Sequence, residues 1–168
     1  MADVKDFNEQ QKTVDDGIQD IDLSAIRKKR FRIDGDNNKI LELNTSDLGI
    51  IDRLRKAYPK LQKLSDKAAS IKFDVDENSD DMEDIAMVAD ALKDVDAEMR
   101  SIVDELFEAP VSDVCATDGT MYDLFNGKYR FEYIVDTIGG LYETNLTKEL
   151  KKLSEKASKH TSKYTKKK

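Results

Sequence analysis

The sequence contains one cysteine, one histidine, two prolines and no tryptophan among its 168 residues. A single cysteine excludes an internal disulfide and any metal cluster built on several cysteines. The only histidine, His160, lies in a lysine-rich stretch, which leaves a nucleophilic triad without a buried base. No run of about 18 apolar residues is present, and the acidic start MADVKDFNEQ is not typical of a signal peptide. We therefore expect a soluble intracellular protein, with no membrane partner and no cofactor, that is not an enzyme.

Charge is unevenly distributed along the chain, whose formal net charge is -7. Residues 3–22 and 74–108 are mostly acidic, whereas 27–32 and 148–168 are basic. An acidic middle and a basic end favour self-association, although solvated helix faces and a disordered tail explain the same pattern equally well. Both basic stretches are short and the chain as a whole is acidic, so nucleic-acid binding is not expected.

The pattern of apolar residues predicts a mostly α-helical, bundle-like protein with a small N-terminal β-hairpin (α+β). In RKKRFRIDGDNNKILEL, residues 27–43, the apolar and polar residues alternate on either side of a turn cluster that contains Gly35. Apolar residues at three- and four-residue spacing then predict helices from about residue 46 to 71, from 80 to 107 and from 131 to 153. The domain prediction is a mobile acidic segment 1–26, one helical domain 27–155 and a basic disordered tail 156–168.

Several local signals refine this prediction. Thr45 or Ser46 is expected to cap the first helix, and Pro59 is expected to kink or break it. A short helical turn is expected over 111–115, and another short helix over 121–125, ended by Gly127. Gly139 and Gly140 interrupt the last helical pattern, which indicates either a close helix contact or a hinge.

The stretch FDVDENSDDMED, residues 73–84, carries seven acidic side chains and raises the question of calcium. An EF-hand loop needs glycine at position 6 and a bidentate glutamate at position 12. Counted from Asp74, those positions hold Ser79 and Ile85. Counted from Asp34, the stretch DGDNNKILELNT has Lys39 and Thr45 there. We therefore interpret residues 73–84 as a solvated acidic loop that leads into a helix, and no metal site is expected.

The order of the elements resembles that of the tail assembly chaperones of long-tailed, siphovirus-type phages of Gram-positive bacteria. The likeness covers roughly residues 30–155 and rests on three segments: FRIDGDNNKILELNTSDLGIIDRLRKAYPKLQKL, VDELFEAPVSDVCATDG and YDLFNGKYRFEYIVDTIGGLYE. In that pattern a hairpin and a helix precede a D-x-LF segment, here Asp104, Leu106 and Phe107, which leads through a polar loop to an aromatic-rich helix. A glycine would be expected near Glu108 or Ala109, where this chain has none.

The resemblance implies a chaperone that coats the long helical tape measure protein until the tail tube polymerises around it, in the cytoplasm of the infected bacterial host. Amphipathic helices with adaptable methionine and aromatic side chains suit such a client. For each candidate residue, an ordinary core position is the alternative interpretation. The predicted partner-binding residues are Met82, Met87, Met99, Leu106, Phe107, Met121, Phe125, Phe131, Tyr133 and Tyr142.

The resemblance also implies a possible longer form of the protein, extended at its C-terminus. The terminal TKKK is compatible with a slippery lysine-codon stretch, and a frameshifted longer form would recruit the tail tube protein.

Two other hypotheses for the function remain open. One is an acidic phage protein that binds or inhibits a host factor by imitating DNA, and the other is a calcium-responsive helical module.

Overall fold

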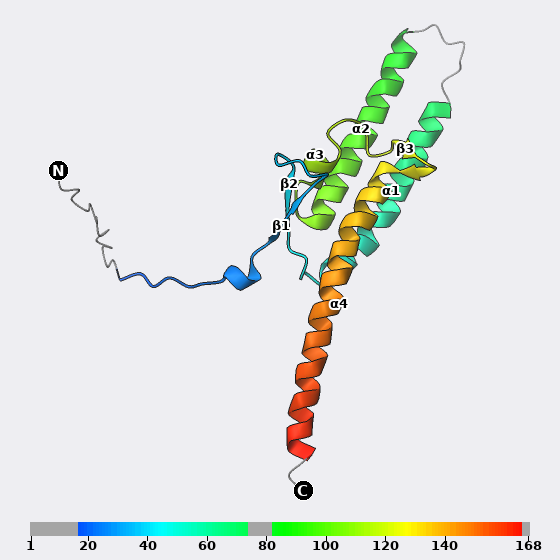
Figure 1. Ribbon diagram of the computed structural model, residues 1–168. Coiled ribbons are helices and arrows are strands. Elements are labelled where there is room, and N and C mark those ends of the chain that lie inside the picture. The colour runs from blue at the N-terminus through cyan, green and yellow to red at the C-terminus, as the bar shows by residue number, and fades with distance from the viewer. Residues whose placement is uncertain (1–16, 74–81, 166–168) are drawn as a thin grey trace, which may run out of the picture.

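The computed structural model describes residues 17–73 and 82–165. Three long helices dominate it: α1 (Ile50–Phe73), α2 (Met82–Phe107) and α4 (Arg130–Thr165). Helices α1 and α2 run antiparallel, and the first half of α4 lies along them while its second half projects beyond the body (Figure 1). The expected helical, bundle-like fold with an N-terminal hairpin is confirmed. Most of the acidic stretch discussed for calcium, residues 74–81, lies outside the described residues.

The N-terminal hairpin pairs β1 (Lys29–Arg32) with β2 (Ile40–Leu43) in antiparallel register, with Phe31 opposite Leu41. Asp34 and Gly35 both have positive φ, 50° and 73°, as a type I′ turn requires. Leu41 and Leu43 are buried, whereas the arginines of β1 are exposed. The alternation of apolar and charged residues therefore places one face of the hairpin on the core and the other in solvent.

Helix α1 begins later than expected and continues further. Its first residue is Ile50, preceded by a turn in which the carboxylate of Asp47 accepts the N–H of Gly49 at 2.8 Å, so neither Thr45 nor Ser46 is the capping residue. The predicted break at Pro59 is absent, because the helix runs from Ile50 to Phe73. Pro59 lies on an exposed face, where the carbonyl that loses its N–H partner can bond to water.

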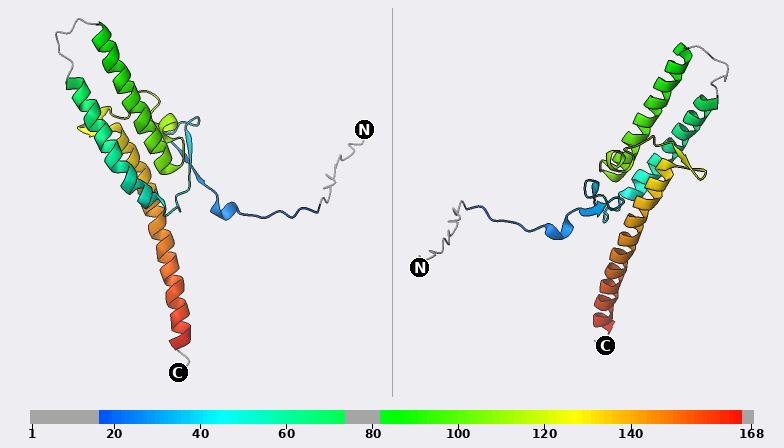
Figure 2. Two further views of the ribbon diagram at one scale, coloured as in Figure 1. Left: turned by 180° about the vertical axis from the view of Figure 1, so that it is seen from behind. Right: turned by 45° about the horizontal axis from the view of Figure 1, so that its top comes forward.

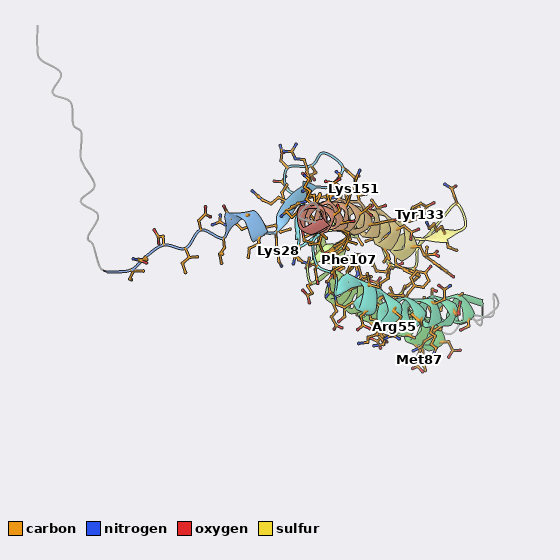
Figure 3. The ribbon with its side chains drawn as sticks, turned by 90° about the horizontal axis from the view of Figure 1, so that it is seen from below. Lys28, Arg55, Met87, Phe107, Tyr133 and Lys151 are labelled. Carbon is orange, nitrogen blue, oxygen red and sulfur yellow. The ribbon has the colours of Figure 1, made fainter. Side chains whose placement is uncertain are left out.

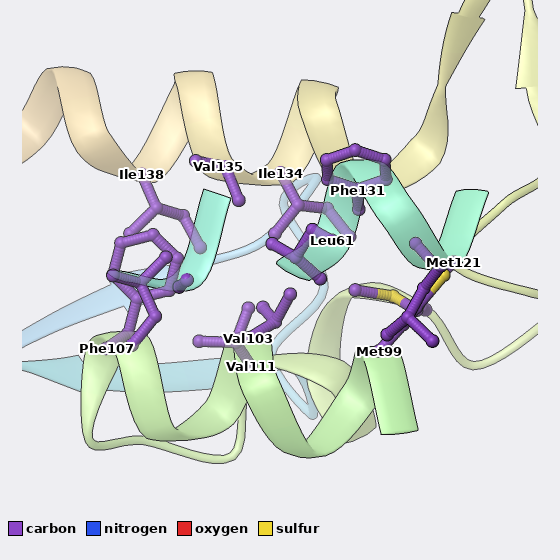
Figure 4. Packing of buried hydrophobic residues seen from close by; sticks show 14 of the residues in the cluster. Leu61, Met99, Val103, Phe107, Val111, Met121, Phe131, Ile134, Val135 and Ile138 are labelled. Carbon is purple, nitrogen blue, oxygen red and sulfur yellow. The ribbon is translucent and has the colours of Figure 1, made fainter. Parts of the chain in front are cut away.

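The core is formed where α4 crosses α1 and α2. Phe131, Ile134, Val135 and Ile138 of α4 face Leu61 of α1 (Figure 4). They also face a row of α2 residues with helical spacing, made of Met99, Val103 and Phe107. Fully burying a side chain of this size stabilises the fold by about 1.5–3 kcal/mol, so this cluster holds the three helices together.

The segment between α2 and α4 contains a confirmed prediction and a wrong one. The short helix α3 (Val111–Cys115) is present, and the Asp104 carboxylate accepts the backbone N–H of Ser112 at 2.7 Å and its hydroxyl at 2.8 Å. The predicted short helix over 121–125 is wrong. Instead β3 (Leu124–Phe125) pairs with β4 (Lys128–Tyr129) across a turn in which Asn126 and Gly127 have φ of 52° and 76°.

Both ends of the described chain extend from the body. Residues 17–28, here called the N-terminal arm, run away from the helices and are exposed throughout, with one 3-10 turn, η1 (Ser24–Ile26) (Figures 1 and 2). At the other end the backbone stays helical to Thr165, which differs from the disordered tail predicted from residue 156. Residues 147–159 of this projecting half are exposed, so the helix continues there without packing against a neighbouring element.

Candidate binding groove between α1 and α4

A groove of about 620 Å³ lies between the first turns of α1 and the middle of α4. Its walls are mostly apolar, and we call it the α1–α4 groove. The apolar side chains that line it and remain partly or fully exposed are Leu48, Ile51, Leu54, Tyr58, Leu146 and Leu150. An exposed apolar surface gathered in one concave place is a sign of a binding site, in contrast to scattered single residues.

The α1 wall exists because the apolar stripe of this helix is wider than its core contact. Ile50 and Leu61 face the core and are buried. The neighbouring row, Ile51, Leu54 and Tyr58, has exposed fractions of 64%, 37% and 38%. These three residues are spaced three and four apart, so they form one line along the helix surface. All three residues of that line border the groove.

The floor on the α4 side is open because two successive residues carry no side chain. A Cβ atom built on either Gly139 or Gly140 meets nothing within 4 Å. The interpretation of these glycines as a close helix contact is therefore wrong. They line the α1–α4 groove, and their missing side chains give it depth.

Tyr58, which lines the groove, also contacts an aromatic ring of the core. Tyr58 packs edge-on against Phe131, with ring centroids 6.3 Å apart and an interplanar angle of 62°. Burial, followed by the carboxylates of Glu132 and Asp136, raises the pKa of Tyr58. The phenol therefore stays protonated at neutral pH, and its hydroxyl is directed to the Glu132 carboxylate.

The apolar line on α4 continues past the groove onto the projecting half of the helix. Leu146, Leu150 and Leu153 follow each other at four- and three-residue steps, and the last two are 53% and 64% exposed. Exposed Lys151 and Lys156 flank this line. Because apolar residues three and four apart share a helix face, the groove and the projecting leucines form one continuous apolar surface. Its charged borders differ, since Asp136 and Glu143 line the groove and the lysines lie beside the projecting part.

Six of the ten predicted partner-binding residues belong to the core. Each of the six is at most 2% exposed, so they do not offer a surface to a partner in this conformation, and the alternative interpretation as core applies to them. They are Met99, Leu106, Phe107, Met121, Phe131 and Tyr142. Of these only Tyr142 borders the α1–α4 groove, and its ring packs on Phe107 with centroids 5.9 Å apart.

The other four predicted residues are exposed but do not gather in one place. Met82 and Met87 lie on the outer part of α2, whereas Tyr133 lies beside the β3–β4 hairpin (Figure 3). The hydroxyl of Tyr133 donates to the carbonyl oxygen of Phe125 at 3.1 Å. The sequence pattern does not reveal the groove, because three- and four-residue spacing places Ile51 and Leu54 on an apolar helix face without showing whether the core covers them. The adjacent pair Ile50–Ile51 was the available signal that this stripe is wider than one contact covers.

Phe125 and Tyr133 border a second hollow of about 500 Å³, which also includes Cys115 and Arg130. Its basic side chain, Arg130, already has partners: it lies 2.8 Å from Asp118 and 3.2 Å from Asp123, and its guanidinium group lies over the Phe125 ring. Burial raises the pKa of the Cys115 thiol, which disfavours the reactive thiolate. The arrangement therefore offers no activated nucleophile.

Other chemistry finds little support in the part of the chain that the structure describes. Within residues 17–73 and 82–165, no group of three or more His, Cys, Asp or Glu side chains could hold a metal ion. None of the described helices has the length and apolar character needed to cross a membrane.

Comparison with known protein families, with curated proteins and with solved structures finds no match to this chain.

Proposed function

We propose that this protein is a non-enzymatic tail assembly chaperone of the type its sequence resembles, acting in the cytoplasm of an infected bacterium. Its α1–α4 groove would hold an apolar stripe of the helical tape measure protein and keep that client soluble until the tail tube polymerises. The observation that carries this proposal is the groove itself, about 620 Å³ in volume and walled by exposed leucine, isoleucine and tyrosine side chains from two helices.

The shape of the surface suits a helical client. Two lines of apolar residues, one on α1 and one on α4, face each other across the glycine floor. An amphipathic helix presents side chains at positions i, i+3, i+4 and i+7 to such a groove. A client helix that lay there would cover Ile51, Leu54 and Leu150, whose exposure in the free protein is otherwise unfavourable. Binding of this kind needs no cofactor, in line with a chaperone role.

The experiment is a titration of peptides from the apolar helices of the tape measure protein into the purified chaperone, followed by calorimetry. Leu54→Glu and Leu150→Glu place a charge in the groove, and each is expected to weaken binding at least about tenfold, the equivalent of about 1.4 kcal/mol. Both residues are exposed, so circular dichroism and the unfolding midpoint should stay near those of the wild type.

The matched control is Met87→Glu, which introduces the same charge at an exposed apolar residue of α2 outside the groove. Its affinity should equal that of the wild type. If the control loses as much affinity as the groove variants, the added charge alone explains the weaker binding. Unchanged affinity in both groove variants would refute the groove as the client site.

A further inference from the structure

The charged side chains that line the α1–α4 groove are both acidic. Asp136 and Glu143 border it from α4, and both are exposed. They are seven residues apart, which at about 100° per residue places them within about 20° of each other around the helix axis and about 10 Å apart along it. The apolar floor of the groove therefore has a line of negative charge along its α4 edge.

Glu143 has no neighbour on its own helix that could neutralise its charge. Ion pairs within a helix form between residues three or four positions apart. The positions at that spacing from Glu143 hold Gly139, Gly140, Leu146 and Thr147. Among the side chains that the structure describes, none forms an ion pair with Glu143. Its carboxylate can therefore pair with a cation that a partner brings to the groove.

The other carboxylates around the groove already have partners. Asp136 forms an ion pair with Lys128, in which both side chains remain exposed. On the α1 edge, Asp52 lies 2.9 Å from Arg55 and 2.5 Å from Lys56. Two cations share one carboxylate there, so the α1 edge carries no excess of negative charge. The two edges of the groove are thus unlike, and the one that attracts a cation is the α4 edge.

We propose that the α1–α4 groove selects a helix whose apolar stripe is bordered, on the side that faces α4, by two lysine or arginine residues seven positions apart. Two helices that lie side by side have the same rise per residue, so this spacing matches that of the two carboxylates. One cation pairs with Glu143. The other joins Lys128 at Asp136, just as two cations share Asp52.

Charges at the rim of an apolar contact act mainly on specificity. They add little affinity, but they discriminate against a helix whose matching positions are acidic or neutral. The apolar stripe of the client therefore explains that it binds in the groove, and the basic border explains which helix is bound. The identification of that helix as the client rests on the proposed function.

The probes are four designed helical peptides of equal length with the same leucine stripe at positions i, i+4, i+7 and i+11. Three have lysine, glutamine or glutamate at i+3 and i+10, beside the stripe. In the fourth, lysine stands at i+2 and i+9, on the face opposite the stripe. Calorimetry with the full chain should show about threefold to tenfold tighter binding for lysine beside the stripe than for glutamine, as expected of two exposed ion pairs. Added salt should reduce this preference.

Substitutions at Glu143 assign the preference to the groove. Glu143→Gln should remove most of the preference for lysine, and Glu143→Lys should make the glutamate peptide bind more tightly than the lysine peptide. The matched control is Glu155→Lys, which makes the same change of charge at another exposed residue of α4 that does not line the groove. It should keep the wild-type order of affinities. Both residues are exposed, so the circular dichroism of the variants should match that of the wild type.

Three results would overturn the proposal. The first is equal affinity of the lysine and glutamine peptides, or of the two peptides that carry lysine on different faces. The second is a lysine preference that Glu143→Gln leaves intact. The third is a peptide affinity that falls as the protein concentration rises, because another copy of the chain would then fill the groove.

Failure of this inference can be distinguished from failure of the proposed function. Tape measure peptides that bind in the groove whatever their charge would leave the proposed function in place and refute the basic border. A lysine preference among the designed peptides, together with no binding of any tape measure peptide, would refute only the proposed client.

Discussion

Arg53 on α1 donates its Nε–H to the carbonyl oxygen of Leu106, at the end of α2, at a distance of 2.8 Å. Its guanidinium also lies 2.7 Å from the Asp47 carboxylate and 3.5 Å from that of Glu108. The side chain is only 25% exposed. One planar group therefore joins the start of α1 to the end of α2, and it satisfies a terminal carbonyl that has no partner within its own helix.

Replacing Arg53 by methionine should lower the free energy of unfolding by about 1–3 kcal/mol, because it removes the Arg53 donor from the Leu106 carbonyl and leaves the Asp47 carboxylate with the Gly49 N–H alone. Lysine at this position should recover only part of the loss, since an ammonium group lacks the planar fork. Urea denaturation measures both variants. The control is Arg55→Met, which removes an exposed pair with Asp52 and should change stability by less than about 0.5 kcal/mol. An equal loss in the control would contradict the assignment.

The same contact predicts a pH dependence. The hydrogen bond from Arg53, followed by that from the Gly49 N–H, lowers the pKa of Asp47 below its ordinary value of 3.8. A carboxyl group with a lowered folded-state pKa contributes stability above its unfolded pKa, and that contribution is lost as the pH falls through the folded value. Wild type and Asp47→Asn should therefore differ most at neutral pH and converge below about pH 3.8. Urea titrations across this range give the difference, and a gap that stays constant would exclude Asp47 as the titrating group.

The spacing of apolar residues along the chain was enough to predict the strands and helices that have one buried and one exposed face. The alternation around Phe31 and Leu41 indicated the hairpin, and the spacing of Met99 and Val103 indicated α2. The β3–β4 hairpin was missed although its signal is local. The apolar residues Leu124 and Phe125, which form β3, were interpreted as part of a short helix, whereas the following Asn126-Gly127 is the dipeptide that a two-residue hairpin turn favours.

The α1–α4 groove could not be predicted from the spacing of apolar residues, because it depends on how the helices pack. Periodicity shows that Ile51 and Leu54 share a helix face, but not whether α4 lies close enough to cover them. That depends on the packing of Phe131 and Ile138, which holds α4 against the core while the glycine floor leaves space. The continued helix after residue 156 has another cause. Lysine and alanine, which occur at Lys156, Ala157 and Lys159, favour helix without any apolar period, so the absence of a stripe did not imply disorder.

Glu108 occupies a backbone conformation that favours glycine. Its φ is 50°, and it follows α2 at the position where the N–H of Ala109 bonds to the carbonyl of Asp104 at 3.2 Å, as in a Schellman motif. Glu108→Gly should raise the free energy of unfolding by about 0.5–1 kcal/mol, because it removes the strain of a left-handed residue and gives up only a long, exposed ion pair. Asn should give a smaller gain, and Ala, which relieves no strain, should give none. The order Gly, Asn, Ala in unfolding midpoint checks the conformational cause, and an equal gain from Ala would point to lost charge instead.

The two glycines of the groove allow stability and binding to be separated. Because a Cβ at Gly139 or Gly140 meets nothing within 4 Å, Gly140→Ala should raise the free energy of unfolding by up to about 1 kcal/mol through helix propensity alone. Gly139→Leu should gain similar stability while its side chain fills the floor of the groove.

Gly139→Leu is therefore expected to bind tape measure peptides at least about tenfold more weakly than wild type while it melts at a higher temperature. A variant that is more stable and binds less cannot have lost binding by unfolding. Thr137→Leu adds the same side chain on an exposed position of α4 that faces away from the groove, and it should leave affinity unchanged. Calorimetric titration and thermal unfolding of the three chains decide the matter. Full affinity in Gly139→Leu would mean that the client binds elsewhere on the molecule.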